Sequence, residues 1–212
     1  MGKVRAVCIS EKRGTQKKNI ESAVFVENWG IEGDAHAGNW HRQISLLSEE
    51  TIVAFKARGA EVTDGAFGEN LVVSGYDFTK FPIGTRFTCK DVVLELTQIG
   101  KECHHGCEIF QKMGECIMPT NGVFAKVLHG GKISVGDEFH VQYRAAVITL
   151  SDTASKGERE DASGAAAEEI VGKEGYEVVF KKIIPDDGDT LTALLCELSD
   201  EDKADLILTT GG

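Results

Sequence analysis

Residues 100–122 hold three of the chain's six cysteines and two adjacent histidines. Side chains of these two types bind zinc or act as nucleophiles, depending on their spacing and surroundings. Zinc sites usually take their ligands from compact pairs, whereas three residues separate the first two cysteines here and the third lies further on. A zinc site therefore stays only as an alternative to a reactive thiol. Its ligands would be Cys103, Cys107, Cys116 and either His104 or His105.

Cys103 is the residue that we expect to react. A reactive thiolate needs a lowered pKa, which cationic neighbours or a helix N-terminus provide. Lys101 and the two histidines supply the cationic neighbours, and a helix beginning near Gly106 would direct amide groups towards the cysteine. Such a thiolate accepts sulfur as a persulfide or ligates a soft metal ion.

Cys107 and Cys116 allow two interpretations. Both lie close to Cys103 in the sequence, so either could act as a resolving thiol that releases the sulfur by forming a disulfide. Cys116 also begins an apolar run that ends at Pro119, which is typical of a buried core segment.

A glycine-rich loop at residues 30–42 carries Asp34, His36, His41 and Arg42. Glycines let the backbone approach an anion closely, and Arg and His donate charge-assisted hydrogen bonds to phosphate. We therefore expect these four residues to contact a cofactor, although an ordinary surface turn capped by Asp34 fits the composition too.

Two lysines complete the predicted binding residues of the first part of the chain. Lys101 precedes the reactive cysteine, and Lys126 lies with Lys132 around a later apolar strand. In an acidic protein they would form an electropositive rim that suits an anionic ligand or a thiolate. Two solvated lysines beside a turn fit the pattern equally well.

Asp152 and Asp186 are the candidate binding residues of the last part of the chain. Each follows a predicted strand, and ligands of parallel sheets bind beyond the carboxyl ends of the strands. Asp186 could hold Mg²⁺ or orient a phosphate. It also begins the cluster "DDGD", which fits a helix N-cap equally well.

The elements that would position these residues change in character near residue 142. Residues 1–142 read as short strands with alternating polarity, separated by turns rich in Gly, Asn and Asp, with one inserted helix at residues 48–60. This pattern predicts a mainly β barrel or sandwich. Residues 143–212 alternate strand, helix, strand, helix and strand, which predicts an α/β domain of three layers with a parallel sheet.

Charge divides the chain in the same way. The net charge is −11, and residues 143–212 hold 16 acidic against 7 basic residues, compared with 18 against 16 in residues 1–142. An acidic chain disfavours a nucleic-acid partner. We see neither a leader nor an apolar run long enough to cross a membrane, so we expect a cytoplasmic protein with reduced thiols.

The order of motifs in the first part of the chain resembles the MOSC domain, the C-terminal module of molybdenum-cofactor sulfurases. The motifs are "GIEGDAHAG", "HRQISLLS", "FGENL", the cysteine stretch and "NGVFAKVLHGGKISVGDEF", and the resemblance covers nearly all of residues 1–142. It implies a β-barrel fold and an essential cysteine that carries sulfur or contacts a molybdenum or pterin group. By position that cysteine is Cys103.

The second part resembles the beginning of the molybdopterin adenylyltransferase family, which includes molybdopterin-binding domains. The resemblance rests on "AAVITLSDTASKGEREDASG", "IIPDD" and "LILTTGG", with the family's aspartates matching Asp152 and Asp186. It covers less than half of that family's usual domain, so we expect a truncated binding domain at residues 143–212 rather than independent adenylyl transfer.

Together these observations predict a sulfur-carrier domain at residues 1–142 followed by a molybdopterin-binding domain. The chain would take part in the biosynthesis or modification of the molybdenum cofactor, with a separate cysteine desulfurase as sulfur donor and a molybdoenzyme or biosynthetic protein as partner. A non-catalytic module that binds and delivers molybdopterin, and a small zinc protein, are the alternatives.

Overall fold

The computed structural model describes residues 1–102, 107–201 and 203–211, and it divides the chain into two compact units, Met1–Val141 and Gln142–Gly212. Cys103 lies outside the described residues, as do His104 and His105. No helix within the described part of the chain is long and apolar enough to cross a membrane.

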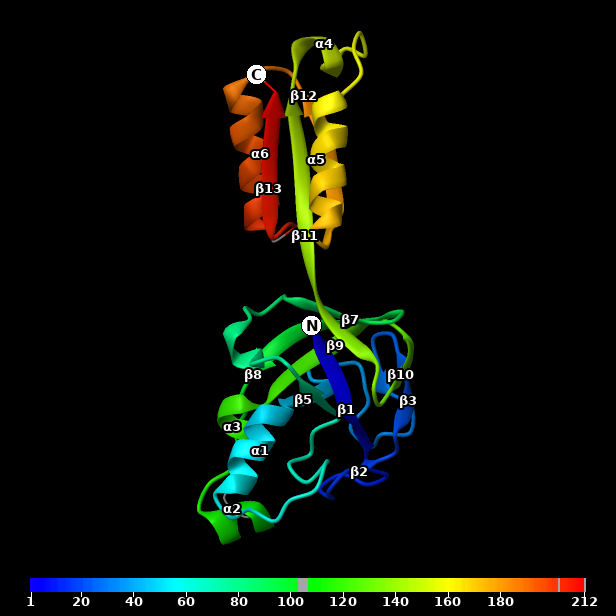
Figure 1. Cartoon of the computed structure of the whole chain (residues 1–212), viewed down its shortest axis with the longest axis vertical. Coiled ribbons are helices and arrows are strands. Elements are labelled where there is room, and N and C mark those ends of the chain that lie inside the picture. Colours follow the sequence, from blue (N-terminus) through cyan, green and yellow to red (C-terminus); the bar gives the residue numbers. More distant parts are fainter. Residues whose placement is uncertain (103–106, 202, 212) are drawn as a thin grey trace. The chain divides into compact units, whose positions relative to one another are not determined.

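The first unit is built on a ring of seven strands (Figure 1). Neighbouring strands follow the order β11-β7-β8-β9-β5-β6-β1, and β1 pairs back with β11, where Gly2 lies opposite Phe139. The sheet is mixed, because β5 and β6 run parallel whereas β5 and β9 run antiparallel. The strands span β1 Gly2–Ile9, β5 Ile44–Ser48, β6 Leu71–Ser74, β7 Arg86–Cys89, β8 Val92–Ile99, β9 Val123–His129 and β11 Glu138–Leu150.

Shorter elements complete this unit. A three-stranded sheet, β10-β3-β4, packs beside the ring, and β2 pairs with β1. Their bounds are β2 Lys18–Asn19, β3 Ser22–Val26, β4 Gly30–Ile31 and β10 Gly131–Ser134. The helices are α1 Glu49–Ala57, η1 Phe78–Lys80, α2 Glu108–Met113 and α3 Met118–Asn121.

The predicted helix after Ser48 is confirmed as α1, but its start differs in detail. Ser48 occupies the cap position without a side-chain cap, because its hydroxyl donates to the Glu50 carboxylate at 2.7 Å instead. The sequence changes in character near residue 142, but one continuous strand, β11, runs through this point, because no Gly, Pro or Asn turn interrupts the sequence there.

The core of the ring is aromatic. Alternate residues of the strands point inward, which places Phe87 and Phe139 in a stacked pair with ring centroids 5.5 Å apart. Phe78 packs edge-on against both rings. A second apolar cluster lies under α1 and gathers Phe55, Phe67 and Ile109. This second cluster supports the loops that form the site described below.

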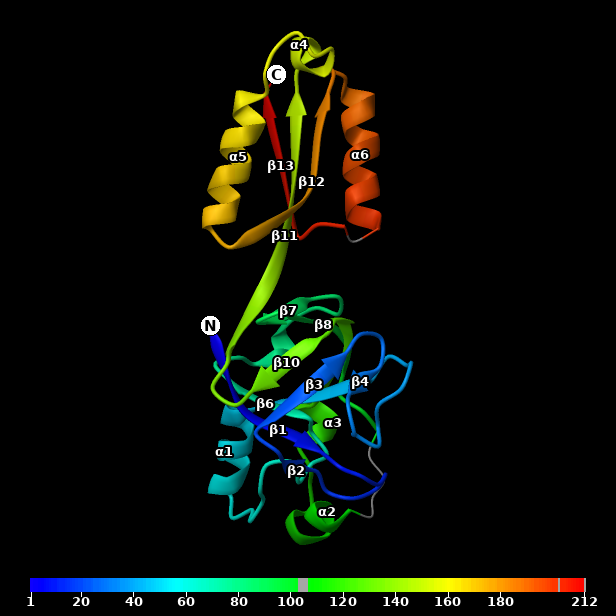
Figure 2. The ribbon, with the colours of Figure 1, turned by 90° about the vertical axis from the view of Figure 1, so that its right-hand side faces the viewer.

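The second unit is a parallel sheet in the order β12-β11-β13. The chain passes from the central strand β11 through α5 to β12, and then through α6 to β13. Both crossovers are right-handed and run in opposite directions across the sheet, so α5 and α6 cover opposite faces (Figure 2). The alternation of strands and helices predicted for this part of the chain is confirmed. The bounds are α4 Asp152–Ser155, α5 Ala162–Lys173, β12 Tyr176–Ile184, α6 Gly188–Asp200 and β13 Leu206–Gly211.

Phe87→Ala should lower the free energy of unfolding of the first unit by about 3–5 kcal/mol, because a side chain that is 1% exposed leaves a cavity behind. Urea unfolding followed by tryptophan fluorescence measures this unit, since Trp29 and Trp40 both belong to it. Ile83→Ala, at a side chain that is 54% exposed, should change the same quantity by about 0.5 kcal/mol or less. Equal losses in the two variants would contradict the assigned core.

Candidate functional site

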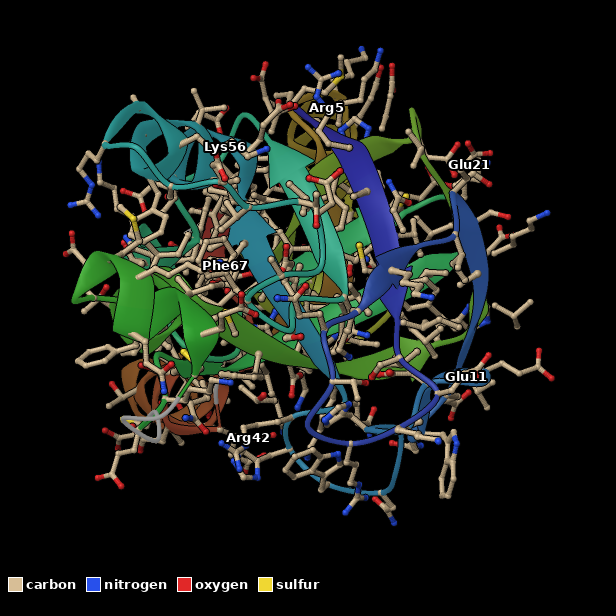
Figure 3. All side chains as sticks on the ribbon, turned by 90° about the horizontal axis from the view of Figure 1, so that it is seen from below. Arg5, Glu11, Glu21, Arg42, Lys56 and Phe67 are labelled. Atoms are coloured by element: carbon tan, nitrogen blue, oxygen red, sulfur yellow. The ribbon has the colours of Figure 1, made fainter. Side chains whose placement is uncertain are left out.

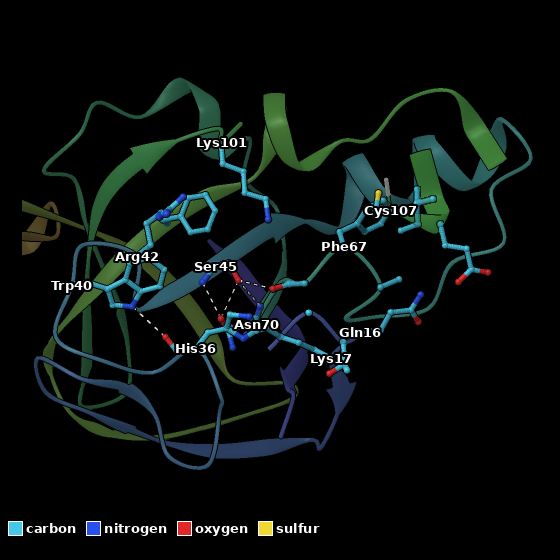
Figure 4. A pocket seen from close by; sticks show the side chains of 17 residues that line it. Gln16, Lys17, His36, Trp40, Arg42, Ser45, Phe67, Asn70, Lys101 and Cys107 are labelled. Atoms are coloured by element: carbon cyan, nitrogen blue, oxygen red, sulfur yellow. Dashed lines mark hydrogen bonds between the residues drawn. The ribbon is translucent and has the colours of Figure 1, made fainter. Parts of the chain in front are cut away.

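The first unit contains a cavity of about 570 Å³, which we call the main cavity. Figure 3 looks onto the end of this unit that carries α2 and β2, where Arg42 and Phe67 lie. The lining combines cationic, polar, aromatic and thiol side chains, as expected of a small-molecule site. Among the lining residues are Lys17, His36, Trp40, Arg42, Ser45, Phe67, Asn70, Lys101, Cys107 and Phe124 (Figure 4).

Arg42 is the best-positioned cation of the main cavity. Its guanidinium carbon lies 4.9 Å from the Trp40 ring centroid and 5.5 Å from that of Phe124. Two aromatic contacts restrict the side chain and leave its donors directed in the plane of the guanidinium group. Its Nε is buried and has no hydrogen-bond partner among the described residues. Arg42 lines the cavity, so an anion entering it would meet a positive charge whose orientation the two rings restrict.

Lys101 adds the second positive charge. Its side chain extends into the cavity from the end of β8, and Cys107 lines the same cavity from the start of α2 (Figure 4). The Cys107 Sγ accepts a hydrogen bond from the Phe110 amide at 3.4 Å. The helix predicted near Gly106 therefore begins at Glu108, and the thiol at its start is that of Cys107.

Asp34 lies behind the cavity wall rather than in the lining. Its Oδ2 is 2.6 Å from the Lys17 Nζ, and the two side chains are 0% and 2% exposed. The same oxygen accepts from the Asn70 amide at 3.0 Å, and Oδ1 accepts from the Ser10 backbone at 3.1 Å. Burial alone would raise the pKa of Asp34, but the hydrogen bonds from Lys17 and Asn70 outweigh it and hold the pKa below its usual value.

His36 lines the cavity as a neutral ring. Burial and the nearby Lys17 ammonium lower the pKa of His36, despite the Asp34 carboxylate 3.7 Å away. A lowered pKa favours the uncharged ring, which would contribute a hydrogen-bonding group rather than a charge. The positive charge that faces the cavity comes from Arg42 and Lys101.

Glu69 supports the part of the cavity wall that residues 66–68 form. Its carboxylate is fully buried and accepts hydrogen bonds from the backbone N–H groups of Gly65 at 2.6 Å and Phe67 at 3.0 Å. Burial raises the pKa of Glu69 to about 7 even though these hydrogen bonds favour the ionised form. The carboxylate thus fixes a loop of which residues 66–68 line the cavity.

Asn70 joins this loop to its neighbours. Its side chain accepts from the Ser45 hydroxyl at 2.9 Å and donates to the Cys8 carbonyl at 3.0 Å. Glu69 and Asn70 of the motif "FGENL" therefore tie neighbouring loops together.

Of the residues predicted from the sequence, the main cavity brings together His36, Arg42, Lys101 and Cys107. His41 lies outside the lining, where its ring pairs with the Gln98 side chain at 3.0 Å.

Two further predicted residues also lie away from the main cavity. Lys126 lies on β9 opposite Glu95. Cys116 packs against the second apolar cluster, which favours its core interpretation.

Three lining residues, Lys17, Trp40 and Phe124, were not predicted from the sequence. Lys17 follows a polar turn and Phe124 lies within the apolar strand β9, so neither carries a local pattern that indicates a site. Trp40 offered a weak signal, because it stands between His36 and His41 in the predicted binding loop.

The second unit has a smaller cavity of about 370 Å³ at the carboxyl ends of its strands, and Ser151, Arg159 and Asp186 contribute to the lining. Asp152 does not line it but accepts the Asp186 N–H at 3.1 Å. The two interpretations of "DDGD" fall on different residues, because Asp187 caps α6 while Asp186 faces the cavity.

The described residues contain no cluster of potential metal ligands. Among residues 1–102, 107–201 and 203–211, no three His, Cys, Asp or Glu side chains gather closely enough to hold an ion. The predicted zinc ligands include Cys103, His104 and His105, which lie outside these ranges.

Comparison with known families divides the chain in two. Residues 33–140 match the model of the MOSC domain, and residues 146–212 match a model described as "Probable molybdopterin binding domain". Two molybdopterin adenylyltransferases match the second part, with 44% identity over 70 residues in Pyrococcus furiosus and 37% over 68 residues in Helicobacter pylori. These matches cover 33% and 31% of this chain, and the chain spans only 40% and 39% of those relatives.

Solved structures share the fold at low identity. The YuaD protein of Bacillus subtilis is 23% identical with a TM-score of 0.56, covering 66% of this chain and 96% of its own. YiiM of Geobacillus stearothermophilus is 16% identical with a TM-score of 0.52, covering 84% of this chain and 94% of its own. At these identities the likeness establishes the fold alone.

Gly65→Ala should destabilise the first unit more than Gly59→Ala. Both glycines have positive φ, so alanine costs about 1–2 kcal/mol at either position. A Cβ at Gly65 would also lie 2.2 Å from the Lys17 carbonyl oxygen, whereas nothing lies within 4 Å at Gly59. In urea unfolding, the free energy of unfolding should fall by about 1–3 kcal/mol more for Gly65→Ala than for Gly59→Ala. Equal losses would mean that the loop with Gly65 does not pack closely against Lys17.

Glu69→Gln should change how stability depends on pH. The folded-state pKa of about 7 lies above the ordinary value of 4.5, so folding favours the protonated carboxyl. The stability it contributes is fully present below the unfolded-state pKa and is lost as pH rises through about 7. The free energy of unfolding of the wild type, minus that of the variant, should fall by about 3 kcal/mol between about pH 4.5 and pH 8. A pH-independent difference would contradict this assignment.

Proposed function

The chain belongs to the MOSC domain family, and from this premise we propose that it acts on the molybdenum cofactor during its biosynthesis or modification. The match of residues 146–212 to a molybdopterin-binding model supports the same ligand class for the second unit. The sequence similarity to molybdopterin adenylyltransferases points in the same direction.

The observation that carries this proposal is Arg42, held between two aromatic rings with a buried Nε that no described residue accepts from. Together with Lys101 it makes the main cavity cationic in a chain whose net charge is −11. Molybdopterin carries a phosphate and a flat ring system, so an oriented guanidinium and aromatic side chains fit it as a substrate. His36, neutral and within the lining, would donate or accept a hydrogen bond.

We assign the sulfur-carrying role to Cys103, two residues after the cavity-lining Lys101. The Cys103 thiolate would attack the terminal sulfur of a persulfide on a cysteine desulfurase. A new S–S bond forms on Cys103, the donor's S–S bond breaks, and the donor leaves as a thiolate. A thiolate at this position would also be soft enough to ligate molybdenum. This chemistry suits the cytoplasm, where thiols stay reduced.

Cys107 is the better placed of the two remaining thiols to release the sulfur. It lines the main cavity and is exposed, whereas Cys116 packs against the second apolar cluster. Attack of the Cys107 thiolate on the persulfide would form the Cys103–Cys107 disulfide and expel hydrosulfide, which a molybdoenzyme or a biosynthetic partner would then receive on its cofactor.

The second unit would hold the pterin in its own cavity. Arg159 and Ser151 would supply donors to a phosphate there, and Asp186 could hold Mg²⁺. A module that only binds and delivers molybdopterin is the alternative function, and the cationic lining of the main cavity suits it equally well.

Cys103→Ser should abolish persulfide formation when the full chain is incubated with a cysteine desulfurase and cysteine, because the nucleophilic sulfur is lost. Mass spectrometry of the peptides locates the persulfide. Cys196→Ser is the matched control, since this exposed cysteine belongs to the second unit, and it should leave the persulfide on Cys103 unchanged. Persulfide that persists in Cys103→Ser would remove Cys103 as the carrier. Tight pterin binding without any persulfide in the wild type would favour the delivery module.

A further inference from the structure

A second cavity, of about 450 Å³, adjoins the main one, and we call it the side cavity. Gln16, Ala66, Glu108 and Ile109 line both cavities, so these four residues lie at the boundary between them. Each volume lies within the range of about 300–1,000 Å³ that is usual for small-molecule sites. A ligand longer than the main cavity could therefore extend into the side cavity past these four residues.

The two cavities differ in charge. Arg42 and Lys101 make the main cavity cationic. In the side cavity the Glu108 carboxylate pairs with Lys112 at 2.8 Å, whereas Glu61 is exposed and interacts with Lys112 only through its charge. Across residues 1–102, 107–201 and 203–211, no hydrogen bond or ion pair joins the Glu61 carboxylate to a protein partner. Because Glu61 is exposed, a ligand in the side cavity would replace water as the donor to its two oxygens.

We propose that the side cavity binds the pyrimidine end of a phosphorylated pterin whose phosphate lies at Arg42, with Glu61 as the residue that recognises the ring. This inference rests on the proposed function and adds the orientation of the ligand. The amino group and the adjacent ring N–H of a 2-amino-4-oxopyrimidine form a pair of donors that matches the two oxygens of a carboxylate.

The remaining lining of the side cavity fits a flat ring. Val62, Ile109 and Met113 are apolar and would contact the ring faces, and the Met113 thioether adapts to aromatic partners. Ala66, at the boundary of the two cavities, has a side chain small enough to leave the connection open.

Neopterin monophosphate, a fluorescent pterin with one phosphate, tests the orientation, and glycerol phosphate serves as a phosphate monoester without the ring. Binding of both to the full chain is measured by calorimetry, with pterin fluorescence as a second readout. Glu61→Gln replaces one acceptor oxygen by a donor, so its Kd for neopterin monophosphate should rise about tenfold. Its Kd for glycerol phosphate should equal that of the wild type.

Three further variants separate the possible outcomes. Glu115→Gln, at an exposed acid that pairs with Arg58 and lines neither cavity, should leave both Kd values unchanged. Ala66→Leu narrows the connection without changing charge and should weaken only the binding of the pterin. Arg42→Gln should weaken the binding of both ligands.

The results distinguish failure of the orientation from failure of the proposed function. Equal affinity of Glu61→Gln and the wild type for neopterin monophosphate would overturn the orientation and leave the anion site intact. Absence of binding by both ligands, or binding that Arg42→Gln does not weaken, would overturn the proposed function together with this inference.

Discussion

The buried ion pair between Lys17 and Asp34 is the interaction on which the main cavity depends. Taking both charges out of water is costly, and the hydrogen bonds from Asn70 and Ser10 to Asp34 compensate part of that cost. Because the four residues come from separate segments of the first unit, the cluster fixes several loops at once. Removing one partner would leave an uncompensated buried charge, so separating these loops would cost several kcal/mol, roughly 3–5.

This arrangement explains why the charge of the cavity differs from the charge of the chain. Asp34 neutralises Lys17, and burial keeps His36 neutral, so neither adds net charge to the lining. Arg42 and Lys101 are left to set the potential of the cavity. A low-dielectric wall of aromatic side chains strengthens their interaction with an anion relative to water.

The parts of the site that the sequence predicted are those with local patterns. The loop around His36 and Arg42 was recognisable because glycines and donors stand close together in the chain, and the α/β alternation after residue 142 was recognisable from its periodicity. Lys17 and Phe124 could not be predicted. Their roles arise from contacts between residues distant in the sequence, with Asp34 in one case and Arg42 in the other.

Covalent linkage gives a further reason why one chain would carry both units. The continuous strand β11 is the link, because it contributes Phe139 to the ring of the first unit and Ala145–Leu150 to the sheet of the second. Under the proposed function both units bind the same ligand class, so the shared strand keeps the two sites in equal amounts. A ligand that has left one unit is free in solution and not tethered to the other, so each site needs an affinity of its own.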